Sequence, residues 1–288
     1  MKYKTVLGIL IFFIVILSLT ATIAGIFSTQ GPGNFEFTSI HGQEILIYGK
    51  GVYRNMSVLA APDGIAQDYV TLILAIPLLI ISFFWAKKDS LKGNLLLAGV
   101  LFYFLFTYLL YMVLIMYNEL FLLYVVLTSL SFFAFALTVM PLNVKDLVVS
   151  FKQELPVRFI GGFLIFISVL VGLNWLGRIV PPLLDGSLIP QGIEHYTTLP
   201  VQGLDLAFVL PIVFLSGVLL IKRKALAYLL APIFVNFLVI MLLAISAKLV
   251  GQSLQGTVGV FPLMMVFLIF SFTAVISSIL IMKNIKEE

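Results

Sequence analysis

The chain has 288 residues, of which 61% are hydrophobic and only 10% are charged, and its mean hydropathy is +1.17. About a quarter of the residues of a soluble domain are charged, so this composition excludes a water-soluble globular protein. The net charge of +4 is accounted for by basic residues in the predicted cytoplasmic loops, so no nucleic-acid partner is expected. Cysteine is absent, which excludes disulfides, thiolate metal sites and thiol redox chemistry.

Apolar runs recur along the whole sequence. A hydrocarbon layer roughly 30 Å thick is crossed by about 20 residues of helix, and each run is long enough to do so. The alternating strands of about ten residues that are typical of an outer-membrane barrel are absent. We therefore predict an all-α membrane protein with eight transmembrane helices. They are expected at 5–27, 69–86, 94–117, 119–140, 158–180, 204–221, 225–247 and 258–282.

The first apolar run has two interpretations. Lys2 and Lys4 resemble the basic start of a signal peptide, and Thr22-Ile23-Ala24 before Gly25 is a weak cleavage site. The run from Thr5 to Phe27 is longer than the apolar part of a typical signal peptide. We therefore expect it to be retained as the first span.

The basic residues predict the orientation of the chain. With a cytoplasmic N-terminus, only Lys50, Arg54, Arg178 and Lys248 of the 17 Lys and Arg residues fall outside. Cytoplasmic loops carry an excess of Lys and Arg, and the opposite orientation would break this rule at nearly every loop. We predict a multi-pass protein of the plasma (cytoplasmic) membrane, in bacteria the inner membrane, with both termini in the cytoplasm.

Two long loops are expected on the outer side. In the loop 28–68, polar and apolar residues alternate over 34–40 and 44–48 around a Gly-containing turn, which predicts a small extracytoplasmic β-hairpin cap. Residues 57–67 are weakly amphipathic and predict a short surface helix or re-entrant turn. The second loop, 181–203, is rich in Pro and Gly and is expected to be irregular but packed.

The two halves of the sequence resemble each other. Residues 6–13 are similar to 159–166, and each half continues with a long outer loop, an Asp at the outer end of a Pro-containing span, a basic inner turn and two further spans. The matching Asp and Pro residues are Asp68 with Pro77 and Asp205 with Pro211. We predict a 4+4 parallel pseudo-repeat with halves 1–140 and 141–288, related by a pseudo-twofold axis along the membrane normal.

Ionisable residues inside the spans would indicate a functional site, but the polar residues gather at the outer boundary instead. There His195 could act as an acid or base near neutral pH, flanked by Asp68, Asp205 or Glu194. The candidate catalytic residues are His195, Asp68 and Asp205. The candidate ligand-binding residues are Lys50, Tyr53, Arg54, Asp68, Glu119, Trp175, Arg178, Glu194, His195, Tyr196 and Asp205.

Each of these residues also has a structural interpretation. An Asp in the first turn of a helix interacts favourably with the helix dipole, which would account for Asp68 and Asp205 without a ligand. Trp175 fits an aromatic belt at the membrane surface. Arg54 and Arg178 could contact lipid phosphates or form salt bridges. No metal-ligand or nucleotide-binding motif is present, so neither a metal nor a cofactor is predicted.

One stretch resembles known sequences. Residues 48–54, Tyr-Gly-Lys-Gly-Val-Tyr-Arg, and 64–68, Gly-Ile-Ala-Gln-Asp, are similar to those of uncharacterised multi-pass membrane proteins of bacteria and archaea. The resemblance covers about the first half of the chain and implies no activity.

These observations favour a non-enzymatic membrane protein that binds or transports a small or lipid-like ligand at an outer-face site between the halves. The lipid bilayer is its expected environment. The alternatives are an interfacial enzyme acting on lipid headgroups and an accessory subunit that docks a partner through its outer loops. The sequence leaves the oligomeric state open.

Overall fold

The structure, a computed structural model, describes residues 2–254 and 259–286. Within them, eight helical stretches are long and apolar enough to cross a membrane, which confirms the prediction of an all-α multi-pass membrane protein. The spans are α1 (Lys4–Phe27), α2–η2–α3 (Ala61–Val70, Thr71–Ala75, Ile76–Lys87), α4 (Leu91–Leu114), α5 (Phe121–Val139), α7 (Val157–Leu184), α8–η3–α9 (Pro200–Leu204, Asp205–Val209, Leu210–Ile221), α10 (Ala227–Leu254) and α11 (Val260–Lys283). The start predicted for the last span, residue 258, lies outside the described residues.

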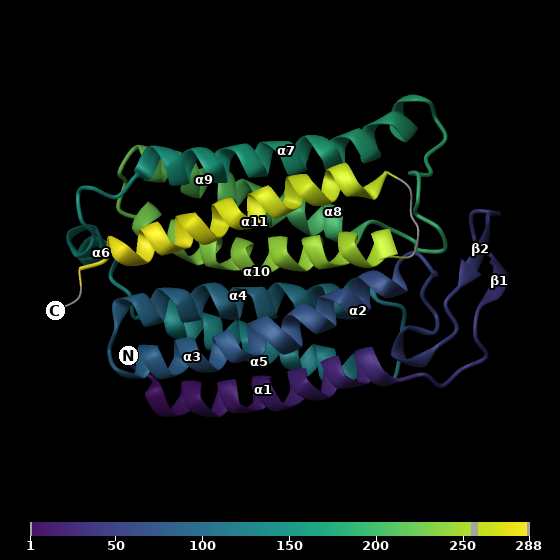
Figure 1. Cartoon of the computed structure of the whole chain (residues 1–288), viewed down its shortest axis with the longest axis horizontal. Coiled ribbons are helices and arrows are strands. Elements are labelled where there is room, and N and C mark those ends of the chain that lie inside the picture. Colours follow the sequence, from purple (N-terminus) through teal and green to yellow (C-terminus); the bar gives the residue numbers. More distant parts are fainter. Residues whose placement is uncertain (1, 255–258, 287–288) are drawn as a thin grey trace.

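The two halves lie side by side, with α4 and α10 at their junction (Figure 1). The apolar windows of these two helices are 61% and 72% buried, against 22–39% in the other spans. Around them α4 contacts α3 and α5, while α10 contacts α2, α9 and α11. Helices that are apolar all round fit such a central position, since protein covers most of their surface.

Close helix packing depends on glycine at two places. A Cβ atom at Gly99 of α4 would lie 2.5 Å from Cβ of Asn236 and 2.8 Å from the carbonyl oxygen of Ile233, both in α10. Gly161 of α7 and Gly217 of α9 face each other in the same way, because a Cβ on either would lie 2.7 or 2.6 Å from the carbonyl oxygen of the other. Small residues let membrane helices approach backbone to backbone.

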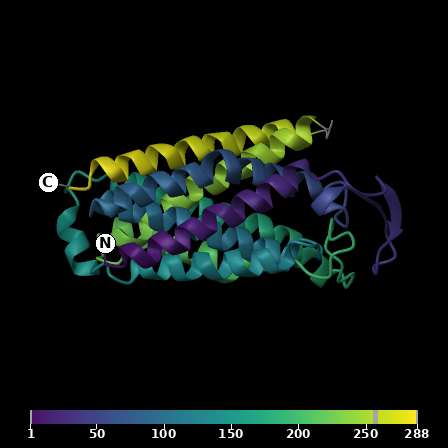
Figure 2. The same ribbon diagram turned by 90° about the horizontal axis from the view of Figure 1, so that it is seen from below.

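The two ends of the molecule differ. At one, the hairpin end, β1 (Phe35–Thr38) pairs antiparallel with β2 (Glu44–Ile47), which confirms the predicted hairpin. Figure 2 shows the hairpin standing beyond the helix ends. At the other, the α6 end, the short helix α6 (Val144–Ser150) joins the halves close to both termini (Figure 1).

Several helices extend further toward the hairpin end than predicted. The second span begins at Ala61 rather than 69, so 57–67 is not a separate surface helix or turn but largely the start of this span. The sixth begins at Pro200 rather than 204. Pro62 and Pro200 lie in the first turns of their helices, where no backbone N–H is needed for a hydrogen bond. These two prolines therefore begin spans and do not lie in separate loop elements.

The second and sixth spans share one irregularity. Both contain a π-helical segment, η2 and η3, and each is followed directly by a dipeptide that ends in proline, Ile76-Pro77 or Leu210-Pro211. When the two spans are aligned on these prolines, the buried Ser82 is also paired with the buried Ser216. The same alignment pairs Asp89 with Arg223, which have positive φ angles of 61° and 50°. These matches support the pseudo-repeat, and the common origin of the halves stays a prediction.

The same alignment corrects one detail of the proposed repeat. It matches Asp68 with Gln202 and Asp205 with Thr71, so the two aspartates do not occupy equivalent positions. The sequence comparison paired them because both precede a proline in an apolar run.

Candidate functional site

Asp68 lies inside the helix bundle and is only 1% exposed. The Tyr53 hydroxyl donates a hydrogen bond to its Oδ2 atom (2.5 Å), and the Tyr111 hydroxyl donates one to Oδ1 (3.0 Å). Tyr111 belongs to α4 and Tyr53 to the short 3₁₀ helix η1 (Gly51–Tyr53), so three elements enclose the carboxyl group. A buried carboxylate needs donors of this kind to offset the loss of hydration.

Tyr53 comes from the hairpin-end loop rather than from a span. Burial raises the pKa of its hydroxyl well above the ordinary value, and the neighbouring Asp68 carboxyl group raises it further. The hydroxyl therefore keeps its proton at neutral pH and remains a donor to Asp68. In this way the loop 28–60 is attached to the interior of the bundle.

A second group of polar residues continues from Asp68 toward the middle of the bundle. Gln67 Nε2 donates to the hydroxyl of Tyr103 (2.8 Å), and Thr71 Oγ1 lies 2.8 Å from the same oxygen. Gln67 is 4% exposed, and its Oε1 atom has no partner within the described part of the chain. Polar groups thus extend one helical turn beyond Asp68 between α2 and α4.

Lys248 of α10 lies among carboxylates of both halves. Its ammonium group lies within electrostatic range of Asp63, Asp68 and Asp205, and within the described residues it forms no direct ion pair with them. Like Asp68, the other two acids also have neutral hydrogen-bond partners. Asp63 accepts a hydrogen bond from Gln252 Nε2 (3.1 Å), and Asp205 accepts one from Trp175 Nε1 (2.9 Å). We call Asp63, Asp68, Asp205 and Lys248 the polar cluster.

An apolar cleft of about 560 Å³ lies between the sixth span and helices α4 and α5, next to the place where α8 contacts α4. Two wall residues, Thr128 and Ser129, carry hydroxyl groups, and Thr128 donates its own to the carbonyl of Tyr124 (2.8 Å) within the same helix. The cleft lies in the half of the bundle nearer the hairpin end. Its walls include Phe102, Phe106, Met112, Thr128, Phe208 and Ile212.

His195 lies where the two long loops meet and is 8% exposed. Its Nε2 atom is 2.9 Å from the carbonyl oxygen of Asn55, so this nitrogen carries the proton and donates it. Beside it, Ser57 Oγ donates to Glu194 Oε2 (2.5 Å). The Nε2 atom of His41, in the hairpin turn, is 3.0 Å from the carbonyl of Tyr196. These contacts hold the loops of the two halves together.

The remaining predicted residues lie on the rim. Arg54 forms an exposed ion pair with Glu119, and the pKa of Glu119 is lowered by a backbone hydrogen bond and by Arg54. Arg178 donates to the carbonyls of Gln191 (3.0 Å) and Gly192 (2.9 Å). Lys50 is exposed. The two arginines therefore connect loops within their own halves.

The structure divides the predicted site residues into two groups. Asp68, Tyr53, Asp205 and Trp175 lie in or beside the polar cluster, whereas His195, Glu194 and Tyr196 take part in loop docking. The dipole explanation is wrong for Asp68, because the acidic residue in the first turn of α2 is Asp63.

Seven participating residues were missed: Asp63, Gln67, Thr71, Tyr103, Tyr111, Lys248 and Gln252. Two signals were available in the sequence. Lys248 ends an otherwise uncharged apolar run, and Tyr103, Thr107 and Tyr111 recur at every fourth position, which places them on one face of a helix.

Among the described residues, no group of three or more His, Asp or Glu side chains is placed to hold a metal ion. The chain matches no known protein family, no curated protein and no solved structure.

Proposed function

We propose that this multi-pass membrane protein binds a lipid-like amphiphile between its two halves. Its apolar part occupies the cleft beside the sixth span, and its polar part lies toward the polar cluster. In keeping with the distribution of basic residues, we assign the protein to the plasma membrane with the hairpin end outside.

The apolar cleft is the observation that carries this proposal. It has room for part of an acyl chain, and small-molecule sites in helical bundles commonly lie between helices. Its walls come from both halves, since α4 and α5 belong to the first and the sixth span to the second.

The polar cluster supports an amphiphile rather than a hydrocarbon. Asp205 adjoins Leu204, and Leu204 and Phe208 both line the cleft, so a charged group lies next to its apolar wall. Lys248 interacts with this carboxylate from α10. Charged groups at this depth are costly in a membrane protein and are commonly functional. A ligand with both an apolar chain and a polar head fits this combination.

The test fills the cleft without changing charge. Ser129 lines the cleft and is exposed, whereas Val126 on the same helix is 45% exposed and lies outside it. We expect Ser129→Phe to reduce cross-linking to a photoactivatable phospholipid about tenfold, because displacing two chain methylenes costs about 1.6 kcal/mol. Val126→Phe should cross-link like the unmodified protein. Equal cross-linking of the two variants would overturn the proposal.

A further inference from the structure

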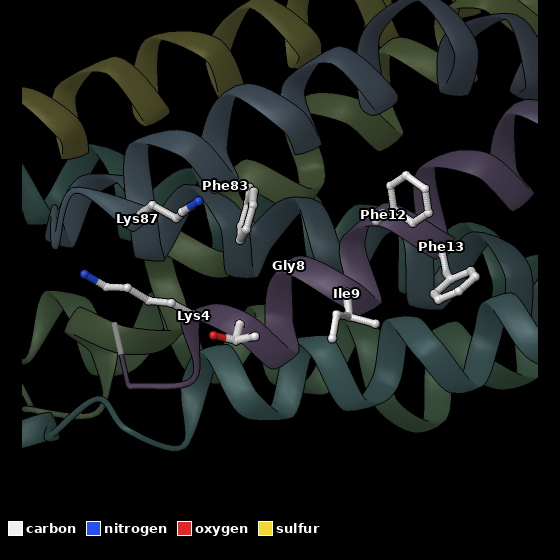
Figure 3. A pocket seen from close by; sticks show the side chains of 8 residues that line it. Lys4, Gly8, Ile9, Phe12, Phe13, Phe83 and Lys87 are labelled. Atoms are coloured by element: carbon white, nitrogen blue, oxygen red, sulfur yellow. The ribbon is translucent and has the colours of Figure 1, made fainter.

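A second membrane-facing groove lies at the α6 end, between α1 and α3. It encloses about 550 Å³ and is lined by residues of these two helices only. Figure 3 shows Lys4 and Lys87 at one end of the groove and Phe12 and Phe13 at the other, with Phe83 between them. This groove is separate from the cleft of the proposed function, which lies in the opposite half of the bundle and on other helices.

Gly8 forms the floor of the groove. A Cβ atom there would lie 3.4 Å from the edge of the Phe83 ring, in ordinary contact, so any larger side chain would occupy the groove itself. Ile9 and Phe12, which line the groove, are 54% and 59% exposed. The walls therefore present apolar surface to the hydrocarbon.

The two lysines at the open end differ in their partners. Lys4 forms an ion pair with Asp89 (2.7 Å), which lowers the pKa of that carboxyl to about 2 and keeps it charged at neutral pH. The Lys87 ammonium lies 5.6 and 5.7 Å from the ring centres of Phe83 and Phe84. It makes no ion pair within the described residues. Among the residues that the structure describes, Lys87 therefore presents a positive charge with no carboxylate in ion-pair contact.

Both lysines lie at the expected depth of lipid headgroups. Lys4 begins α1 and Lys87 lies in the last turn of α3. Long basic side chains at such helix ends extend along apolar surface and place their charge at the membrane interface.

We propose that this groove binds an anionic phospholipid, with the phosphate beside Lys87 and Lys4 and one acyl chain over Gly8. The shape and the charge of the groove match such a lipid, because lysines lie at its interfacial end and apolar side chains line the end that faces the membrane interior. A second copy of the chain is a poor occupant. Copies in one membrane share an orientation, so a neighbour would bring its own basic α6 end, including Lys88 and Lys222, toward Lys4 and Lys87.

The first test places a fluorescent reporter in the groove. The chain has two tryptophans, Trp85 and Trp175, and replacing both by Phe gives a background for the single reporter Phe12→Trp. The control reporter is Phe166→Trp on α7, because Phe166 is 55% exposed and lies outside the groove. Both proteins are reconstituted in phosphatidylcholine vesicles that contain brominated phosphatidylglycerol or brominated phosphatidylcholine as quencher.

We expect the groove reporter to prefer brominated phosphatidylglycerol about fivefold, the effect of about one well-placed lysine. Lys87→Gln should remove most of this preference, and the control reporter should show little preference. Equal preference at both reporters, or a preference that survives Lys87→Gln, would overturn the proposal, because general attraction to a basic membrane surface would then explain the data.

A second readout avoids the reporter substitutions. By native mass spectrometry, Lys87→Gln in the otherwise unmodified chain should retain about fivefold less phosphatidylglycerol. Lys222→Gln, an exposed lysine just after α9 at the same end of the bundle, should retain the normal amount. Similar losses in both variants would contradict a specific groove. Because neither variant touches the cleft beside the sixth span, these results are independent of the proposed function.

Discussion

Gly25 has no side chain at the point where α1 meets the carboxyl group of Asp68. A Cβ atom at this position would overlap with Asp68 Oδ2 and lie 2.9 Å from Cγ. The carboxyl group cannot move aside freely, since the hydroxyls of Tyr53 and Tyr111 hold one oxygen each. The position of the most buried acid in the polar cluster therefore depends on a residue that makes no polar contact through a side chain.

At this scale we predict that Gly25→Ala lowers the free energy of unfolding in detergent by about 2 kcal/mol, a typical cost of overpacking a well-filled site. Gly162→Ala is the control, because a Cβ there meets nothing within 4 Å. It should be neutral or slightly stabilising, since Ala favours a helix over Gly.

A double-mutant cycle separates this contact from a general effect on α1. If the overlap with Asp68 is the cause, Gly25→Ala should cost much less in an Asp68→Ala background than in the unmodified chain. Strictly additive effects of the two substitutions would show that the contact with Asp68 is not responsible.

At the scale of elements, the sequence predicted most where one physical constraint dominates. The eight spans were predicted because each apolar run is long enough to cross the hydrocarbon layer. The hairpin β1–β2 was predicted from the alternation of polar and apolar residues. The starts of the second and sixth spans were missed because 57–67 was predicted as a separate surface element and 181–203 as an irregular loop. The π-helical segments η2 and η3 are only five residues long and continue α-helices on both sides, so the hydrophobic periodicity of the sequence carries no signal for them.

The candidate site was predicted less completely for a related reason. Its residues are brought together by packing between spans, and an apolar sequence does not reveal which faces meet. Asp68 and Tyr53 were identified as polar residues near the outer boundary, but their contact with Tyr111 depends on how α2 and α4 pack. The cleft beside the sixth span has no motif at all, since it results from incomplete packing between apolar helices.

Neighbouring glycines in α7 allow a strict test of helix packing. A Cβ at Gly161 would lie 2.7 Å from the carbonyl oxygen of Gly217, whereas one at Gly162 meets nothing within 4 Å. We predict that Gly161→Ile lowers the free energy of unfolding by about 3 kcal/mol, because α7 and α9 must separate. Gly162→Ile should change it by less than about 0.5 kcal/mol. Thermal unfolding in detergent measures both, and equal midpoints would mean that α7 and α9 do not pack through these glycines.

For the whole molecule, the two sides of the central α4–α10 pair differ. The second span packs extensively against α10 through α2, whereas the sixth span contacts α4 less extensively through α8 and leaves the apolar cleft beside this contact. In an exact pseudo-repeat these two interfaces would be equivalent. Here the interface between α2 and α10 is closed, whereas the interface between the sixth span and α4 is partly open, and we call the latter the open junction. The loops bridge the halves at the hairpin end through Ser57 and Glu194 and through His195 and Asn55. The open junction therefore lies beneath a loop region that both halves share.

The orientation of this assembly can be measured with single cysteines, because the natural chain has none. Gln43 and Ser187 are exposed in the two hairpin-end loops, and Lys88 and Lys224 are exposed in the turns at the α6 end. If basic loops stay in the cytoplasm, Gln43→Cys and Ser187→Cys should react with a membrane-impermeant maleimide in intact cells. Lys88→Cys and Lys224→Cys should react only after permeabilisation.

Each half contributes one position to each pair, so the experiment also tests whether the halves share an orientation. Four spans in the first half return the chain to its starting side, which requires Gln43 and Ser187 to behave alike. Labelling of Gln43→Cys but not Ser187→Cys in intact cells would mean an odd number of crossings between them. Such a result would rule out a parallel repeat, and it would also separate the loops that His41 and His195 join. If only the two α6-end cysteines were labelled in intact cells, the fold would stand but its orientation in the membrane would be the opposite of the predicted one. The cleft would then lie in the cytoplasmic leaflet.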